Sequence, residues 1–153
     1  MSGSSTEVDV VVAFWDALYA RDWEAIASFF GPDSLYYDVP VGPGAAGKGP
    51  DSIVARLQLG LAGLAGYDHH PDRVLTANAD GWVMTEHTEV WTWDGGNTVA
   101  LPFVSVQRVV DGVITRWRDY WNQQTLMEAA PAEWHDRLAT ADLSWVHDAT
   151  TEW

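Results

Sequence analysis

The hydrophobic positions of this chain change their period along its length, from helical spacing near the N-terminus to strand alternation further on. Segments 6–20 and 23–30 place apolar residues three or four positions apart, as amphipathic helices do. Thr6 and Asp22 stand at their starts and are suited to cap the first turns. A third stripe of this kind runs through 52–64. These segments are therefore predicted to be helices.

Five segments read instead as strands, because they alternate in polarity or are rich in β-branched and aromatic residues: 35–39, 67–77, 82–93, 98–110 and 113–121. Pro71 indicates an edge or broken strand, and Pro102 requires a bulge or an edge position. Tight turns are predicted at 94–97 and 111–112. Helices followed by a meander of strands favour an α+β fold: a curved antiparallel sheet wrapped around the N-terminal helices, with a deep apolar pocket between them.

The loop at 40–50 holds four glycines and three prolines, and Asp51 after it is predicted to cap the third helix. The loop follows only a short strand and lacks the Lys-Ser/Thr ending of a phosphate-binding loop. We expect it to form the rim of a pocket.

At 153 residues, the chain is expected to form a single domain over 1–153, with its α+β core at 6–128. A short closing helix is predicted at 123–130. The C-terminal extension, 131–153, carries three tryptophans and one further possible helix at 132–138. We expect so aromatic a segment to pack either on the body or on a partner chain.

The net charge of −14, from 22 acidic and 8 basic residues, argues against binding to nucleic acid or to an anionic membrane. The absence of cysteine excludes disulfides, thiolate nucleophiles and thiolate zinc sites. The first residues do not form a secretion signal, and no apolar run approaches the roughly 18 residues that span a bilayer. We therefore expect a soluble, cytoplasmic protein.

Titratable residues stand on strand faces that also carry tryptophans or tyrosines. Asp119 lies between two tryptophans on its face, where a carboxylate must find a donor or keep its proton. His87 and Glu89 share one face of a longer strand, about 7 Å apart. Tyr36 and Asp38 share a face of the shortest strand. If these faces line the pocket, the side chains form an acid–base set.

Each of these residues also has a plainer interpretation. Asp119 could be a structural carboxylate, and His87 and Glu89 could lie on a solvated face beside surface tryptophans. The pair His69-His70 suggests a metal site, but adjacent strand residues point to opposite faces. We interpret that pair as part of a surface loop and predict neither a metal nor a cofactor.

Five segments resemble the limonene epoxide hydrolase branch of the nuclear-transport-factor-2-like superfamily, which also contains SnoaL-like polyketide cyclases and ketosteroid isomerases: 14–18, 29–30, 36–40, 84–90 and 112–121. The block Trp117-Arg118-Asp119-Tyr120 is the most specific of them. The resemblance extends over roughly 6–128. It implies a cone with a deep hydrophobic pocket, a homodimer, and a small hydrophobic ligand such as a terpenoid, a steroid or a polyketide-like molecule.

In the hydrolases, an Asp and a Tyr/Asn pair hold the attacking water, an Arg bridges, and a second Asp protonates the epoxide. By position, Asp119 matches the water-activating Asp and Tyr36 matches the Tyr. Asp38 stands at the Asn position, His87 at the Arg position, and Glu89 at that of the acid. His in place of Arg exchanges a permanent charge for one that titrates near neutrality.

The departures leave three functions open. The first is epoxide hydrolysis, with Asp119 activating water and Glu89 donating a proton. The second is an isomerase or cyclase, because Asp38 also falls where ketosteroid isomerases place their proton-transferring Asp. The second acid of those isomerases is missing, since the region around Val104 is apolar. The third is a module that binds a small molecule without converting it.

Overall fold

The protein is described here from a computed structural model that covers residues 6–77 and 80–153, without the side chains of 74–77. The helices are α1 (Glu7–Tyr19), α2 (Trp23–Ala27), α3 (Pro50–Leu61), α4 (Gln123–Ala129) and α5 (Ala132–Thr140), with a 3-10 turn η1 (Pro43–Ala45). The strands are β1 (Leu35–Asp38), β2 (Ala46–Lys48), β3 (Gly66–Ala77), β4 (Trp82–Thr92), β5 (Thr98–Val110), β6 (Val113–Trp121) and β7 (Val146–His147). The α+β class is confirmed.

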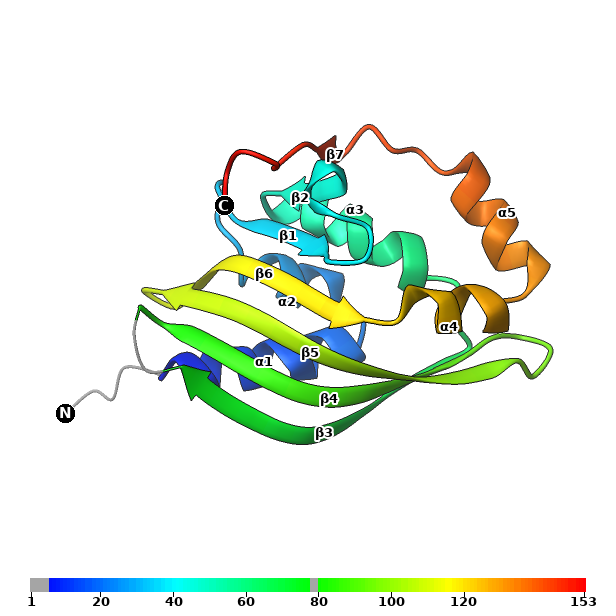
Figure 1. The fold of residues 1–153 in the computed structure, drawn as a ribbon, viewed down its shortest axis with the longest axis horizontal. Helices are drawn as coiled ribbons and strands as arrows, with labels where there is room; N and C mark the ends of the chain where they lie inside the picture. The colour runs from blue at the N-terminus through cyan, green and yellow to red at the C-terminus, as the bar shows by residue number, and fades with distance from the viewer. Residues whose placement is uncertain (1–5, 78–79) are drawn as a thin grey trace.

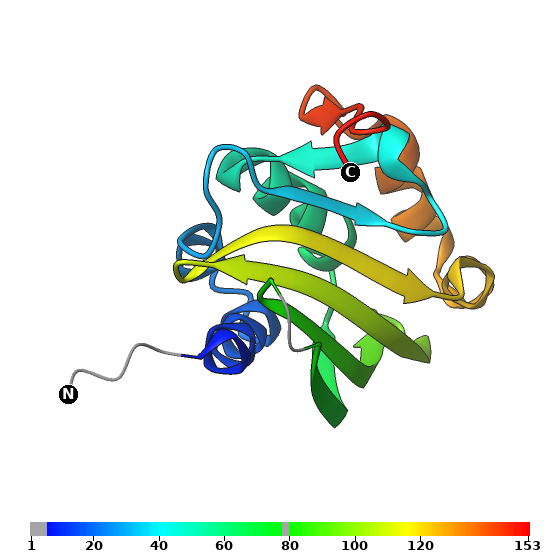
Figure 2. The ribbon, with the colours of Figure 1, turned by 60° about the vertical axis from the view of Figure 1, so that its left-hand side comes forward.

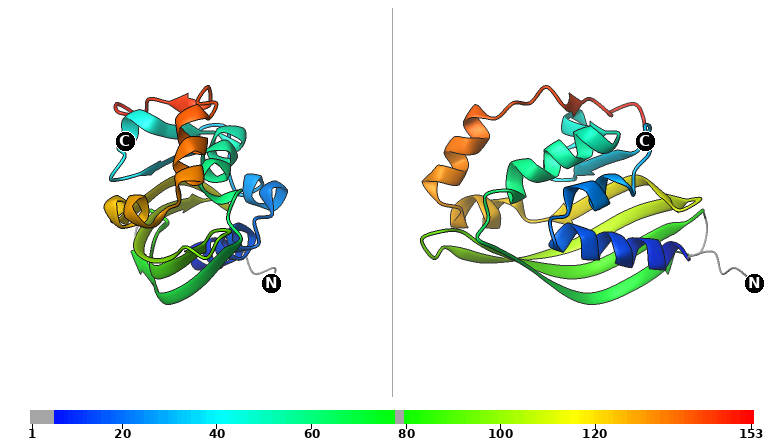
Figure 3. Two further views of the ribbon diagram at one scale, coloured as in Figure 1. Left: turned by 90° about the vertical axis from the view of Figure 1, so that its right-hand side faces the viewer. Right: turned by 180° about the vertical axis from the view of Figure 1, so that it is seen from behind.

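The strands form one sheet in the order β3-β4-β5-β6-β1-β2-β7. Helices α1, α2 and α3 lie against one face of this sheet, which Figure 3 shows from behind. The four long strands sweep across the molecule in Figure 1, and the turned view in Figure 2 makes their curvature plain. The curved sheet around N-terminal helices therefore agrees with the prediction.

One pairing in the sheet differs from the predicted antiparallel arrangement. Strand β1 runs parallel to β6, with Asp38 opposite Asp119, whereas the other neighbouring strands pair antiparallel. A parallel pairing is possible because β1 and β6 are joined by a long crossover rather than by a hairpin. As a result, two carboxylates from distant parts of the chain share one face of the sheet.

The predicted strand phases hold in β4, where Thr85, His87, Glu89 and Trp91 are all buried. In β6 the phase changes at a β-bulge, because Arg108 pairs with Arg116 but the next residue of β5 pairs with Ile114. Ile114 therefore faces the core, although simple alternation places it outside.

The positions of Pro71 and Pro102 in the sheet agree with the predictions made for these two prolines. Strand β3 lies at the sheet edge, with an irregular register between Pro71 and Arg73. Pro102 is locally at an edge, since the pairing of β5 with β6 begins only at Phe103.

The helix starts agree with the predicted caps in two cases. The Thr6 hydroxyl accepts a hydrogen bond from the Asp9 amide, and Asp22 caps α2. Asp51 is not the cap of α3, because that helix begins at Pro50 after Gly49. Proline suits the first helical position, since its amide nitrogen has no hydrogen to leave unpaired. Strand β2 lies inside the predicted loop and is too short for its alternation to be visible.

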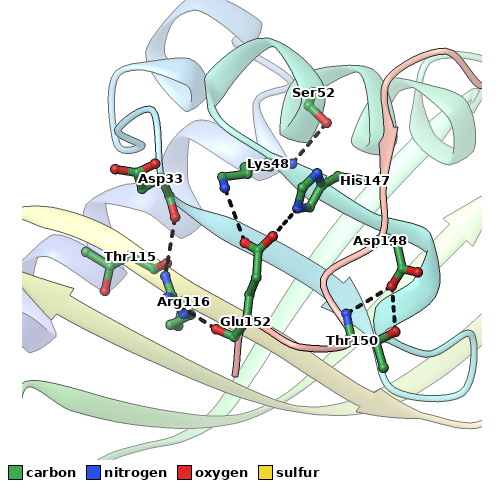
Figure 4. Close-up of polar contacts among 9 residues, drawn as sticks. All are labelled: Asp33, Lys48, Ser52, Thr115, Arg116, His147, Asp148, Thr150 and Glu152. Carbon is green, nitrogen blue, oxygen red and sulfur yellow. Dashed lines mark hydrogen bonds and ion pairs between the residues drawn. The ribbon is translucent and has the colours of Figure 1, made fainter.

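The C-terminal extension packs on the body. Strand β7 pairs with β2, and the Ser52 hydroxyl donates to the Trp145 carbonyl at 2.7 Å. The Glu152 carboxylate accepts from Lys48 Nζ at 3.2 Å and lies 2.5 Å from His147 Nε2, as Figure 4 shows. These contacts hold the chain end over β1 and β2.

Over the part of the chain that the structure describes, no helix combines the length and the apolar character needed to cross a membrane.

Candidate active site

An apolar cavity of about 280 Å³ lies between the concave face of the sheet, helix α3 and the C-terminal extension. Aromatic and aliphatic side chains supply most of its wall, among them Leu57, Trp91, Phe103, Trp117, Trp121, Trp134 and Trp145. Four of the predicted site residues also line it: Tyr36, Asp38, Glu89 and Asp119. The fifth, His87, lies behind the wall and is only 1% exposed.

The two carboxylate oxygens of Asp119 differ, because one accepts hydrogen bonds from the protein and the other does not. Its Oδ1 accepts hydrogen bonds from Ser105 Oγ and from Trp117 Nε1, both at 2.6 Å. None of the described residues donates to Oδ2. That oxygen is therefore available to a water molecule or a substrate in the cavity.

Asp38 is held by a cation. Its Oδ2 forms an ion pair with Arg56 Nη2, and its Oδ1 accepts from Trp121 Nε1 at 2.9 Å. The Tyr36 hydroxyl lies 3.1 Å from both oxygens and donates to this carboxylate. Arg56 comes from α3 and lies over the ring of Trp145, with 5.9 Å from the guanidinium carbon to the ring centre. The Asp38 end of the cavity thus contains a compensated charge.

Glu89 is held by neutral donors instead. Its Oε1 accepts from the hydroxyls of Tyr19 at 2.8 Å and Tyr67 at 2.9 Å, and its Oε2 accepts from Trp91 Nε1 at 2.8 Å. No cation among the described residues forms an ion pair with it. Burial raises the pKa of Glu89 to about 7, although the three hydrogen bonds act to lower it.

The His87 ring lies between Asp119 and Glu89 but forms a hydrogen bond with neither carboxylate. Its Nε2 is 2.8 Å from Ser105 Oγ, and Ser105 donates to Asp119. Its Nδ1 is 3.1 Å from His69 Nε2 and 3.3 Å from the Tyr19 hydroxyl. Burial, reinforced by His69, lowers the pKa of His87 to about 3, so the ring is neutral at neutral pH.

The proton balance of the cavity follows from these environments. Burial raises the pKa of Asp119 well above its ordinary range, and the charges of Asp38 and Glu89 add to that rise. Burial, followed by the charge of Asp38, also raises the pKa of Tyr36. The raised pKa of Asp119 makes its carboxylate a stronger base than an exposed aspartate, while a pKa of about 7 lets Glu89 carry a proton near neutral pH, so the cavity contains both a base and an acid.

Sequence reasoning missed several residues that contact the predicted set, among them Arg56, Ser105, Tyr19, Tyr67 and His69. Arg56 lies in α3, three residues after Ile53 and beside the apolar stripe of that helix. Its position at the margin of the stripe is the only feature of the sequence that could have indicated a role in the site. Ser105 alternates with Phe103 on the inner face of β5, and Tyr19 follows Trp15 by one helical turn. The alternation of β5 could have predicted that Ser105 faces inward, but not that it forms hydrogen bonds with His87 and Asp119.

His69 contacts the set as well, and the prediction of a surface loop is wrong for the His69-His70 pair. Both residues lie in strand β3, and the His69 ring stacks on Tyr19 with a ring-centre distance of 3.9 Å. Burial, followed by His70, lowers the pKa of His69 to about 4. The described residues contain no group of three His, Asp or Glu side chains placed to hold a metal ion.

A curved sheet around helices, with several carboxyls opening into an apolar cavity, defines a cone-shaped α+β fold with an interior pocket. The model of the SnoaL-like domain family matches residues 11–117, and the chain belongs to that family, within the nuclear-transport-factor-2-like superfamily. The resemblance inferred from the sequence is thereby confirmed at the level of the family.

Three solved structures illustrate the range of proteins that share this fold. An LEH-like epoxide hydrolase from M. tuberculosis is 24% identical, with 80% of this chain and 87% of that chain covered and a TM-score of 0.67. A Catenulispora acidiphila DSM 44928 protein with a ketosteroid isomerase-like fold, in complex with trimethylamine, is 21% identical, with coverage of 85% and 98% and a TM-score of 0.70. TerC, co-crystallised with polyporic acid, is 24% identical, with coverage of 82% and 98% and a TM-score of 0.70. At these identities the likeness extends to the fold.

Proposed function

We propose that the protein is a cofactor-independent enzyme that hydrolyses the epoxide of a small hydrophobic molecule. One observation carries the proposal: Asp119, with a free oxygen, and Glu89, with a pKa of about 7, open into the same apolar cavity. Epoxide opening by water needs a base on one side and an acid on the other, and this pair can supply both.

In the proposed step, Asp119 is the base and Glu89 is the acid. Asp119 Oδ2 accepts a proton from a water molecule while the water oxygen bonds to one epoxide carbon. The carbon–oxygen bond of the ring breaks, and Glu89 donates its proton to the leaving oxygen. The product is a diol, with Asp119 protonated and Glu89 ionised. Tyr36 and Asp38, beside Asp119, are proposed to orient the water.

The surroundings favour an uncharged, mostly hydrocarbon substrate. Tryptophan, phenylalanine and leucine side chains make up most of the wall, and such a wall stabilises a bound apolar molecule. Terpenoid, steroid and polyketide-like molecules fit this description. The epoxide hydrolase among the structural neighbours supports the reaction class by similarity of fold.

The test is an assay of the purified protein against a panel of cyclic and acyclic epoxides, with the diol detected by mass spectrometry. We expect diol from at least one terpene-like epoxide, and a loss of about 10²–10⁴-fold in Asp119→Asn, because the base is removed. Circular dichroism should show the variant folded. If no epoxide yields a diol, the proposal fails; saturable binding without turnover would then favour a binding module.

A second function, proton transfer at a ketone by an isomerase or cyclase, is favoured by the ion pair of Asp38 with Arg56 at the cavity wall. Asp38 would take the proton next to the carbonyl. Solvent deuterium would then enter a bound ketone, and Asp38→Asn would abolish the exchange.

From the resemblance we also propose that the protein acts in the cytoplasm as a homodimer. Analytical ultracentrifugation should then give twice the mass of the chain.

A further inference from the structure

A continuous line of hydrogen-bonding groups connects the two carboxyls behind the cavity wall. From Asp119 Oδ1 it passes to Ser105 Oγ at 2.6 Å and on to His87 Nε2 at 2.8 Å. From His87 Nδ1 it continues to the Tyr19 hydroxyl at 3.3 Å and ends on Glu89 Oε1 at 2.8 Å. Ser105, His87 and Tyr19 are absent from the cavity lining.

We propose that Ser105, His87 and Tyr19 form a proton relay that returns a proton from Asp119 to Glu89 after each turnover. The inference rests on the proposed hydrolysis, because that reaction leaves Asp119 protonated and Glu89 ionised. Before another substrate can react, one proton must travel between them. The relay supplies a path for it that does not cross the substrate space.

Each group on the line can both give and accept a hydrogen bond, so the whole line has two consistent states. With Glu89 protonated, it donates to Tyr19, Tyr19 donates to Nδ1 of His87, Nε2 of His87 donates to Ser105, and Ser105 donates to Asp119. After rotation of the protonated Asp119 carboxyl brings its O–H toward Ser105, every hydrogen bond points the opposite way. Passing from the second state to the first moves one hydrogen at each step and converts the Nδ1–H tautomer of His87 into the Nε2–H tautomer.

The central position requires a group that is neutral and has two nitrogen atoms facing opposite ways. His87 meets both conditions, since its ring is buried and uncharged and its two nitrogens face Ser105 and Tyr19. An arginine at this position could not release its proton. His69 Nε2, at 3.1 Å from Nδ1, can donate to the same lone pair and so stabilise the Nε2–H tautomer before the reaction.

Two tyrosines give a matched pair for the test. The hydroxyls of Tyr19 and Tyr67 both donate to Glu89 Oε1, at 2.8 and 2.9 Å, but only Tyr19 reaches His87. Tyr19→Phe therefore breaks the relay, whereas Tyr67→Phe removes a similar hydrogen bond and leaves the relay complete.

The measurement compares diol formation in one turnover, with enzyme in excess, with the steady-state rate of the same variant. For Tyr19→Phe we expect a single-turnover rate within about threefold of wild type and a steady-state rate reduced at least about tenfold, visible as a burst of one diol per site. For Tyr67→Phe the two rates should change by the same factor. Solvent deuterium should slow the steady-state phase of Tyr19→Phe more than its burst.

Ser105 tests the other arm independently. Ser105→Ala should give the same burst, and Ser105→Thr, which keeps the hydroxyl, should restore the steady-state rate. If both relay variants change the two rates equally, the relay is overturned while the hydrolase stands. If the wild-type protein forms no diol, the proposed function fails, and the relay fails with it.

Discussion

Asp38 and Glu89 are both buried carboxylates at the wall of one cavity, but opposite kinds of partner hold them. Asp38 pairs with the guanidinium of Arg56, while Glu89 is surrounded by two phenols and an indole. A neighbouring cation repays the cost of burying an anion, whereas neutral donors repay only part of it. The pKa of Glu89 accordingly lies near 7.

This difference shows how one apolar cavity can hold a charged carboxylate and a proton donor at once. The arginine that compensates the charge of Asp38 comes from helix α3. The parallel pairing of β1 with β6 brings the Asp38 carboxylate next to Asp119. Asp119, beside a carboxylate rather than a cation, has its pKa raised. The comparison therefore predicts that Glu89 supplies protons and that the Asp38–Asp119 side receives them.

The largest expected effect is on catalysis. Glu89→Gln keeps the shape of the side chain but cannot donate an acidic proton, so the rate of diol formation should fall by about 10²–10⁴-fold. The matched control is Glu86→Gln, because Glu86 lies on the outer face of the same strand and is exposed. Comparable losses in the two variants would contradict a special role for Glu89.

The next largest effect is expected when Asp38 loses the cation that compensates its charge. Arg56→Met leaves a buried carboxylate without its cation and should lower the free energy of unfolding by about 4 kcal/mol. Adding Asp38→Asn should recover part of that loss. Lys48→Met removes a much more exposed pair with Glu152 and should cost less than about 1 kcal/mol. Urea denaturation of the three variants and the wild-type protein measures these differences.

Stability should also depend on pH through Glu89. Its pKa is about 7 in the folded protein and 4.5 when it is exposed, so the unfolded state ionises first as the pH rises. Stability is then lost between about pH 4.5 and 7, by about 3 kcal/mol in all. Glu89→Gln should lack this loss. Unfolding free energies of both proteins at pH 5 and pH 8 test the sign, and an equal pH dependence would refute it.

The smallest expected effect concerns Trp145, whose ring lies against Arg56, the ion-pair partner of Asp38. Trp145 lines the cavity and stacks on Arg56, so Trp145→Ala should weaken substrate binding, raising KM about fivefold, or about 1 kcal/mol. Trp153 packs on Tyr37 outside the cavity, and Trp153→Ala should leave KM unchanged. Steady-state kinetics on the same substrate distinguishes the two tryptophans.

Much of the fold could be predicted because periodicity is a local signal. Strand β6 has the predicted bounds, and the phase of β4 correctly turns His87 and Glu89 inward. The parallel pairing of β1 with β6, the short strand β2 and the bulge that turns Ile114 inward depend on contacts between distant segments. Sequence spacing alone does not encode those contacts.

The candidate site divides in the same way. The strand faces and the family resemblance name the five predicted residues, and the structure brings four of them to the cavity wall with His87 behind. The partners that set their protonation, above all Arg56, Ser105 and Tyr19, come from α3, β5 and α1. Nothing in their local sequence indicates which carboxylate each would meet.

The most direct test of the account is to follow the Glu89 carboxyl and the reaction rate through the same pH range. Carbon-13 NMR of the labelled side chain, assigned by its loss in Glu89→Gln, should give a midpoint near pH 7, as burial among neutral donors requires. Diol formation should fall through the same midpoint as the pH rises. A midpoint near the ordinary 4.5, or a rate that increases as Glu89 ionises, would contradict the assignment of Glu89 as the proton donor.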